Sequence, residues 1–200
     1  MVVSAPSGTG KTTLCTRLLE SRPSLKISVS TTTRPLRGAE VAGVDYDFVD
    51  VATFKRMIDE GAFVEWAEVH GKYYGTSKGR VDELLRSGND VLFDVDVQGA
   101  ESLKAVYGEK AFTVMLLPPT LEELERRLRG RGTDDEETIA VRLGNSRREL
   151  ARWQTFDEVV VNDDLELALE DLEAVLDGRR PPHTDRERVS RRLFGAGASP

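Results

Sequence analysis

The sequence Ser-Ala-Pro-Ser-Gly-Thr-Gly-Lys-Thr-Thr at residues 4–13 matches the phosphate-loop pattern G-x-x-x-x-G-K-[ST], except that Ala5 stands at the first glycine position. A short apolar strand, residues 2–4, precedes the loop, and a helical pattern follows it. This context predicts a strand, a tight loop and a helix whose first backbone N–H groups converge on an anion. Pro6 favours an extended Ala5, where a Cβ costs little, so the alanine is compatible with the pattern.

The loop predicts a nucleoside triphosphate site that uses Mg²⁺ as cofactor. The Lys11 ammonium would bridge the β- and γ-phosphates, and the Thr12 hydroxyl would be a ligand of the hard Mg²⁺ ion. The residues expected to hold ATP are Ala5, Pro6, Ser7, Gly8, Thr9, Gly10, Lys11, Thr12 and Thr13.

Short apolar runs alternate with longer helical patterns along the rest of the chain, which predicts an α/β fold with a mostly parallel sheet flanked by helices. The expected strands are residues 2–4, 25–30, 62–66, 90–95, 111–117 and 158–162. The expected helices are residues 11–21, 51–60, 78–86, 99–106, 121–129, 136–153 and 165–176. Two helix starts have capping-box spacing, Thr120 with Glu123 and Thr133 with Glu136. Residues 31–78 break the alternation and predict an inserted subdomain.

Composition excludes several classes of protein. The chain has 200 residues and a formal charge of −7, which argues against general nucleic-acid binding, and it has no apolar run of membrane-spanning length. One cysteine and two histidines offer neither a disulfide nor metal-ligand spacing, which fits a reducing cytoplasm. Residues 178–200 contain six arginines together with Pro and Gly, which predicts a disordered tail. The first strand is short, so we expect a further segment upstream of Met1.

Seven further stretches, in one colinear order with the phosphate loop, resemble guanylate kinases. They are SVSTTTRPLRGAE (28–40), DYDF (45–48), EWAE (65–68), YYGTS (73–77), DVDVQG (94–99), GRGTDDEE (130–137) and VVNDDL (160–165). The resemblance covers residues 1–177. It implies a P-loop kinase fold with a core (1–30, 78–125 and 154–177), a small mixed α/β subdomain for the nucleoside monophosphate (31–77) and a helical lid (126–153).

The resemblance also implies a site for the phosphate of GMP. Arg34 and Arg37 would grip this phosphate, and the hydroxyls of Tyr46 and Tyr74 would donate to the same oxygens. Guanidinium forks suit phosphate oxygens because they can bind two of them at once. Leu36 stands where the family usually has the proline before the second arginine, so the local backbone of this loop is expected to differ.

The base of GMP would be selected by Glu65, whose carboxylate can accept hydrogen bonds from guanine N1–H and the N2 amino group. Ser30 and Thr76 would donate to O6, and Asp96 would add a polar contact near the base or ribose. A mismatched base would then leave buried polar groups unpaired. The family commonly has Ser at the position of Thr76, which keeps the hydroxyl and adds a methyl group.

On the donor side, the resemblance implies that Asp94 supports Mg²⁺ through its waters, although a carboxylate there could instead cap the next helix. Arg127, Arg131 and Arg142 match lid arginines that close on the ATP phosphates, and Asn162 matches the loop beside the adenine. The expected catalytic residues are Lys11, Arg34, Arg127, Arg131 and Arg142.

These residues predict an ATP:GMP phosphotransferase that also accepts dGMP, by in-line transfer, in the recycling of GMP and the supply of guanine nucleotides. ATP and GMP are the expected partners, without nucleic acid or membrane, in the cytoplasm; the sequence leaves the oligomeric state undetermined. Two alternatives remain: a catalytically inactive guanylate-kinase-like module that binds proteins, and a kinase for another nucleoside monophosphate.

Overall fold

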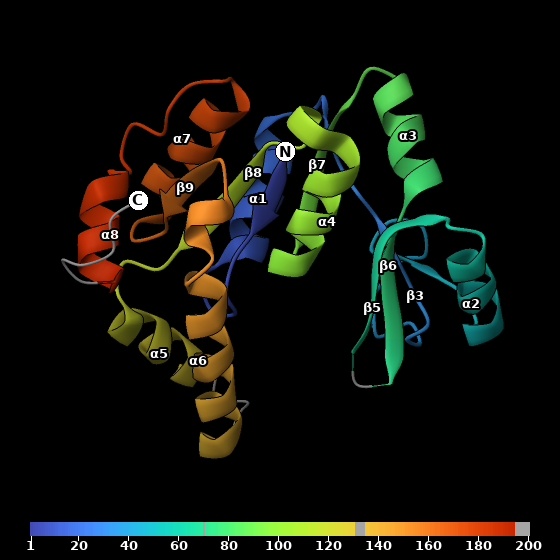
Figure 1. Ribbon diagram of the computed structural model, residues 1–200, viewed down its shortest axis with the longest axis horizontal. Coiled ribbons are helices and arrows are strands. Elements are labelled where there is room, and N and C mark those ends of the chain that lie inside the picture. Colours follow the sequence, from blue (N-terminus) through green and yellow to red (C-terminus); the bar gives the residue numbers. More distant parts are fainter. Residues whose placement is uncertain (70, 131–134, 195–200) are drawn as a thin grey trace.

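A five-stranded parallel sheet forms the centre of the molecule (Figure 1). The computed structural model describes residues 1–69, 71–130 and 135–194, and no helix within them is long and apolar enough to cross a membrane. The strand order is β2-β7-β1-β8-β9, with bounds Leu25–Ile27, Asp90–Val95, Val2–Ser4, Thr113–Leu117 and Glu158–Val161.

Helices cover both faces of this sheet, because successive strand residues point to opposite sides. Val3 packs into one apolar cluster with helices α1 and α7, whereas its neighbour Val2 packs into another with α4, α5 and α6. The helix bounds are Lys11–Ser21 (α1), Lys78–Arg86 (α3), Val97–Tyr107 (α4), Leu121–Arg129 (α5), Glu136–Leu150 (α6) and Leu165–Leu176 (α7), with 3₁₀ turns at Gly108–Lys110 and Trp153–Thr155. The predicted α/β architecture is therefore confirmed.

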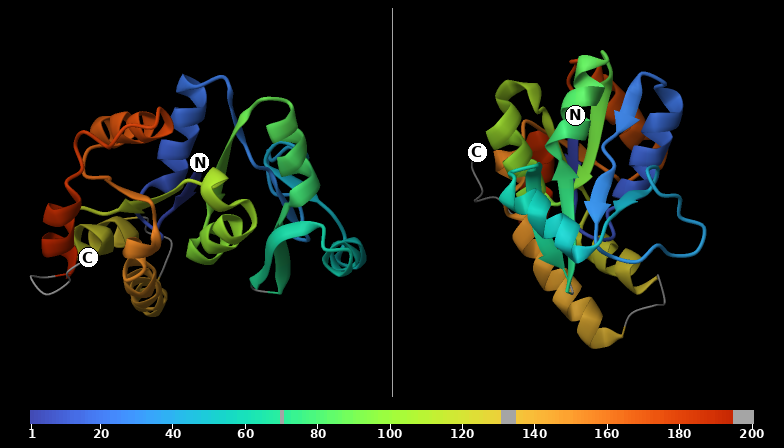
Figure 2. Two further views of the ribbon diagram at one scale, coloured as in Figure 1. Left: turned by 45° about the horizontal axis from the view of Figure 1, so that its top comes forward. Right: turned by 90° about the vertical axis from the view of Figure 1, so that its right-hand side faces the viewer.

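A second sheet of four strands lies beside the first and belongs to the stretch that breaks the alternation. Its order is β4-β3-β6-β5, with bounds Tyr46–Phe48, Ser30–Thr32, Lys72–Ser77 and Phe63–Val69. Helix α2, Val51–Asp59, packs against it through the fully buried Phe54. Figures 1 and 2 show this sheet and α2 on the far side of α4 from α5 and α6.

The strand expected at residues 25–30 is divided in the structure. Its first half is β2, at the edge of the parallel sheet, and its last residue begins β3 in the mixed sheet. Leu25 is buried in the parallel sheet, and Thr31 and Thr32 are buried in the mixed sheet. Buried residues therefore occur on both sides of the break, and their pattern does not reveal it. Residues 28 and 29 are the connection between the two sheets.

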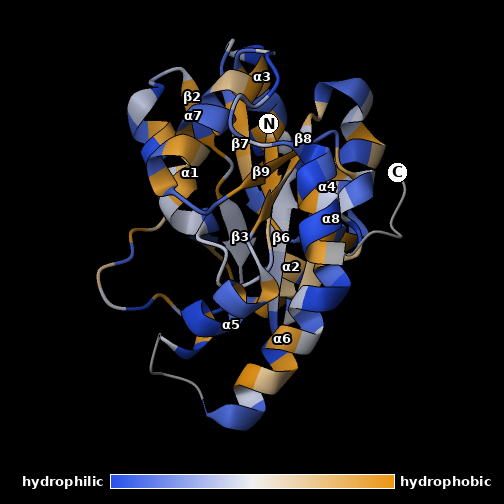
Figure 3. Cartoon of the chain, turned by 90° about the vertical axis from the view of Figure 1, so that its left-hand side faces the viewer, coloured by the Kyte–Doolittle hydropathy of each residue, from blue (hydrophilic) through white to orange (hydrophobic). Residues whose placement is uncertain are grey.

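Helices α5 and α6 extend beyond the end of the parallel sheet, and Figure 3 shows α5 as largely hydrophilic. The N–H of Glu123 donates to the Thr120 hydroxyl at 3.0 Å, as the capping box predicts. The Glu123 carboxylate instead binds Arg126 and Arg127, which hold its pKa at about 2. Helix α6 has Asp135 as its N-cap, and the predicted cap Thr133 lies outside the described residues.

The prediction of a disordered tail does not hold for residues 186–194, which form helix α8, Arg186–Phe194. Val189 and Leu193 lie four residues apart on one helix face and are buried in the cluster that contains Trp153 and Phe156. The residues just before α8 also contact the edge strand β9, because the Val161 N–H donates to the Thr184 hydroxyl at 3.0 Å. Composition missed this helix because two apolar residues suffice to anchor a single short helix on an existing core.

Candidate active site

The phosphate loop connects β1 to α1 and requires glycine at two positions. Gly8 and Gly10 have φ of 92° and 94°, in the region that side chains disfavour. Gly10 also forms the N-cap of α1, and a Cβ there would lie 2.5 Å from the Asn162 amide nitrogen. The close approach of that amide leaves room only for glycine. Thr12 and Thr13 are exposed on the first turn of the helix.

Lys11 reaches across the sheet to the carboxyl end of β7. Its ammonium donates to the Val95 carbonyl at 2.7 Å and forms an ion pair with Asp94. Ligands of open parallel sheets bind at this edge. The lysine and the carboxylate predicted for the donor site are therefore in direct contact.

Asn162 joins the loop after β9 to the phosphate loop. Its side-chain amide donates to the Thr9 carbonyl at 2.7 Å, and both residues are buried. The Arg127 guanidinium donates to the Asn162 carbonyl at 2.9 Å. These contacts bring the expected adenine-side residue and one expected lid arginine to the phosphate loop.

A second set of predicted site residues lies in the mixed sheet. Glu65 and Thr76, the residues expected to bind the base, lie opposite each other on the paired strands β5 and β6. The Thr76 hydroxyl donates to the Glu65 carboxylate at 2.6 Å, and Thr76 is almost fully buried. Burial raises the pKa of Glu65, the hydrogen bond from Thr76 lowers it, and the negative charge of Asp96 raises it further. Ser30 begins β3, the neighbour of β6 in the same sheet.

Arg34 lies at the other end of this sheet, buried to 6% exposure. Its guanidinium stacks 4.8 Å from the centre of the Tyr46 ring, which lies 6.3 Å edge-on from the Tyr74 ring. Two of its nitrogens donate to Glu40 at 2.6 and 2.8 Å, and this pair holds the pKa of Glu40 at about 2. Arg37 is exposed, and its backbone N–H donates to the same carboxylate at 2.8 Å.

Asp96 is close to both sets of site residues, because it follows the Lys11 partner Asp94 by two residues and its charge acts on Glu65. It is the N-cap of α4 and accepts the Gly99 N–H at 2.8 Å, so the capping considered for Asp94 is carried out by Asp96. Arg142 lies on α6, and Arg131 lies outside the described residues.

Two carboxylates at the site escaped the sequence reasoning. Glu40 ends the stretch 28–40 that resembles the family and stands three residues after Arg37. Its position next to Arg34 and Arg37 could have indicated a carboxylate that pairs with an arginine. Glu149, on α6, is electrostatically coupled to Asp96 and Lys11 and belongs to no motif that singles it out.

The donor residues fit Mg²⁺ bound chiefly by a nucleotide. Among residues 1–69, 71–130 and 135–194, no group of three His, Cys, Asp or Glu side chains could hold a metal ion. Thr12 offers a hydroxyl and Asp94 a carboxylate, and both are hard oxygen donors. Mg²⁺ commonly uses one or two such protein groups together with phosphates and several waters.

Comparisons with known proteins all lead to one family. The family model described as guanylate kinase matches residues 1–179. A guanylate kinase from Anaeromyxobacter dehalogenans is 53% identical over 187 residues, covering 93% of this chain and 83% of that protein. One from Myxococcus xanthus is 50% identical over 198 residues, covering 98% and 93%. The crystal structure of guanylate kinase from Anaplasma phagocytophilum has a TM-score of 0.70 at 28% identity, covering 97% of this chain and 94% of that one.

Proposed function

This chain belongs to the guanylate kinase family, and from that membership we propose how its residues phosphorylate GMP with ATP. The reaction moves the γ-phosphoryl group of ATP to a phosphate oxygen of GMP. The bond between the γ-phosphorus and its bridging oxygen breaks, a new phosphorus–oxygen bond forms, and ADP and GDP result. The acceptor is already an anion at neutral pH, so catalysis depends on positioning and on neutralising charge.

On the donor side, the N–H groups of the phosphate loop and the start of α1 would hold the ATP phosphates. Lys11 would exchange its contact with Asp94 for the β- and γ-phosphates, and Asn162 would hold the loop beside the adenine. Thr12 and, through water, Asp94 would hold Mg²⁺, which supplies positive charge next to the phosphate oxygens.

On the acceptor side, the observation that carries the proposal is the Glu65–Thr76 pair. A half-buried carboxylate fixed by a buried hydroxyl suits a base that presents adjacent N–H donors, as guanine does. Ser30 would contact the same base. Arg34, stacked on Tyr46, would bind the phosphate of GMP together with Arg37 and Tyr74.

We assign residues 31–77 to the acceptor subdomain and residues 126–153 to the lid. Closure of both would bring Arg127, Arg131 and Arg142 onto the transferring group and exclude water, which limits hydrolysis of ATP. We further propose that the enzyme acts in the cytoplasm, where its nucleotides are, and that it also uses dGMP.

An ADP-release assay with GMP, AMP, CMP and UMP tests the assignment. We expect turnover with GMP, and Lys11→Ala should abolish it while the variant keeps the wild-type circular dichroism spectrum. Lys26→Ala, which removes an exposed lysine bonded to the Pro23 carbonyl, is the matched control and should retain full activity. No turnover of any monophosphate would support a protein-binding module, and preference for another monophosphate would support a different kinase.

A further inference from the structure

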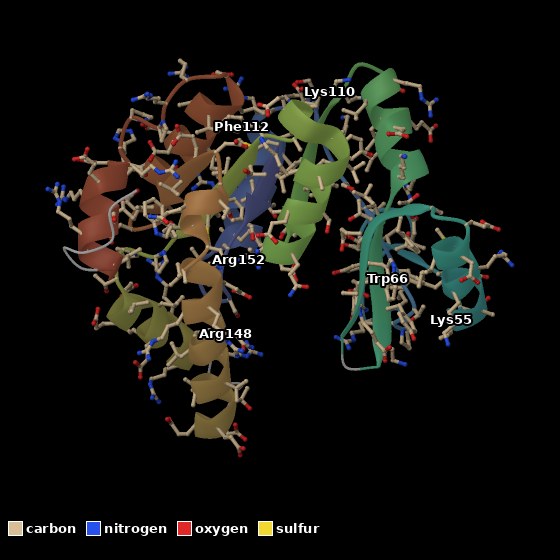
Figure 4. The ribbon with its side chains drawn as sticks, in the orientation of Figure 1. Lys55, Trp66, Lys110, Phe112, Arg148 and Arg152 are labelled. Atoms are coloured by element: carbon tan, nitrogen blue, oxygen red, sulfur yellow. The ribbon has the colours of Figure 1, made fainter. Side chains whose placement is uncertain are left out.

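One face of α6 carries a row of polar side chains, of which the family assignment explains only Arg142. Arg142, Asn145 and Glu149 follow one another at intervals of three and four residues, so they lie on the same side of the helix. Arg152, just beyond the helix, continues this side and pairs with Glu101 on α4. Figure 4 shows Arg148 and Arg152 on the side of α6 that faces α4 and the mixed sheet.

A cavity of about 280 Å³ lies between this face and the start of α4. Asp96 and Gln98 line one wall, and Asn145 and Glu149 line the other. Asp96 follows Val95, whose carbonyl accepts from Lys11, so the cavity adjoins the end of β7 where the phosphate-loop lysine lies.

Glu149 lines this cavity, and its carboxylate oxygens can accept further hydrogen bonds. Its side chain is half-buried, and no side chain in the described part of the chain donates a hydrogen bond to its carboxylate. Burial and the nearby charge of Asp96 raise its pKa, and the charge of Lys11 lowers it. A half-buried carboxylate of this kind lacks a donor, which a ligand can supply.

The carboxylates form a series across the site. Asp96 acts on the pKa of Glu65 at the base end and on that of Glu149 on α6, and Glu149 is in turn coupled to Lys11. Asp96 is thus shared between the expected base position at Glu65 and the cavity that Glu149 lines. The acceptor ribose is bonded to the base, so a ribose on the Asp96 side of Glu65 would lie beside this cavity.

The chemistry of this position selects hydroxyl groups. Arg148 and Arg152 also line the cavity, but Arg148 donates to Asn145 at 2.7 Å and Arg152 is paired with Glu101, so Asp96 and Glu149 remain as acceptors for a donor group. A resident metal ion would need a third ligand of the kind that the described residues do not gather there. Neutral hydroxyls donate hydrogen bonds to carboxylates without adding charge to the cavity.

We propose that Glu149, together with Asp96, accepts hydrogen bonds from the hydroxyls of the acceptor ribose, so that Glu149 sets the preference for GMP over its deoxy analogues. This inference rests on the proposed function, because it needs the base at Glu65 and the phosphate at Arg34. It assigns to α6 a part in recognising the acceptor as well as the donor nucleotide.

The test compares kcat/KM for GMP, 2′-deoxyGMP and 3′-deoxyGMP in the wild type, Glu149→Ala and Glu149→Gln. We expect the wild type to prefer GMP over at least one analogue. Glu149→Ala should reduce that preference about tenfold, the size expected for loss of a hydrogen bond to a charged acceptor. In Glu149→Ala, kcat/KM should decrease for GMP and stay near the wild-type value for the analogue. Glu149→Gln should keep part of the preference, because its amide oxygen can still accept a hydrogen bond.

Glu137→Gln is the matched control, because it makes the same charge change on the exposed first turn of α6. It should leave the preference at the wild-type value. An equal loss for GMP and the analogues in Glu149→Ala would assign Glu149 a purely structural role and overturn the inference, as would an unchanged preference. Absence of GMP turnover in the wild type would instead contradict the proposed function, so the two failures are distinguishable.

Discussion

At the scale of single residues, the proposed role of Glu65 predicts that guanine binding depends on pH. Burial and the charge of Asp96 place its pKa above the ordinary value of 4.5. Below that raised pKa the carboxyl carries a proton and cannot accept from both guanine donors. We therefore expect the KM for GMP to rise as the pH falls through the raised pKa, with the KM for ATP changing less over the same range.

Steady-state kinetics from pH 8 downward measures this effect, and Glu65→Gln is the comparison because its amide does not titrate. The variant should bind GMP weakly at every pH and show a flatter profile. The stability effect has the opposite sign: an acid whose folded-state pKa is raised favours the fold at low pH, and this contribution is lost as the pH rises through that pKa. A wild-type profile as flat as that of the variant would contradict the role of Glu65.

Glu40 gives a second prediction at this scale. Its carboxylate binds the guanidinium of Arg34 and the backbone N–H of Arg37, so it fixes the two arginines relative to each other. We expect Glu40→Ala to raise the KM for GMP roughly tenfold through loss of a charge-assisted pair, and to leave the KM for ATP unchanged.

Isothermal titration with GMP and with an ATP analogue separates the two effects of Glu40→Ala. Glu60→Ala, which removes an exposed carboxylate 3.9 Å from Arg56 on α2, is the control. Tighter GMP binding by Glu40→Ala would show that Glu40 competes with the phosphate instead of positioning its ligands.

Motifs could indicate which residues matter, but not which of them touch. The spacing of residues 4–13 predicted Lys11 at a phosphate site, and the strand before Asp94 placed that acid at the same edge of the sheet. The ion pair between the two depends on the parallel pairing of β1 and β7, which brings together residues over eighty positions apart. Glu149 was missed because its proximity to Lys11 follows from how α6 packs, and no local pattern encodes that.

At the scale of elements, α8 is held by few but well-buried contacts. Leu193 is 9% exposed in the main apolar cluster, and the Arg186 guanidinium stacks 5.1 Å from the centre of the Trp153 ring. We expect Leu193→Ala to lower the free energy of unfolding by about 2 kcal/mol, at the low end for a buried leucine, because the site is close to the surface.

Urea denaturation measures this change, and the exposed Arg191→Ala on the same helix should stay within about 0.5 kcal/mol of the wild type. Equal midpoints for Leu193→Ala and the wild type would mean that α8 does not pack as described.

Helix periodicity located α1, α3, α5 and α7 with the bounds that the structure has, because each has apolar residues at helical spacing. The division of residues 25–30 between two sheets was beyond such reasoning. The residue pattern of a strand indicates which of its faces is buried, but not which of two sheets the strand joins.

At the scale of the whole molecule, the two groups of site residues lie on separate bodies. The phosphate loop and Lys11 belong to the parallel-sheet body, and Glu65 and Arg34 belong to the mixed-sheet body (Figures 1 and 2). In-line transfer needs the reacting atoms about 3–3.5 Å apart, so we expect the two bodies to approach each other when both nucleotides are bound.

We expect the radius of gyration, measured by small-angle scattering, to fall most when GMP and a non-hydrolysable ATP analogue are both present. Each nucleotide alone should produce a smaller change, because only the pair bridges the two bodies. Lys11→Ala should weaken the response to the ATP analogue and keep the response to GMP. Full contraction with GMP alone would contradict this requirement for both nucleotides.

The path of the chain between the two sheets determines the direction of that approach. The polypeptide enters the mixed-sheet body through residues 28 and 29 and leaves it where β6 passes directly into α3, at Ser77 and Lys78. A body attached at two places has one easy motion, rotation about the line that joins them. The acceptor nucleotide would thus travel on an arc fixed by two short backbone crossings, and its angle of arrival at the γ-phosphate would be a property of the chain's connectivity.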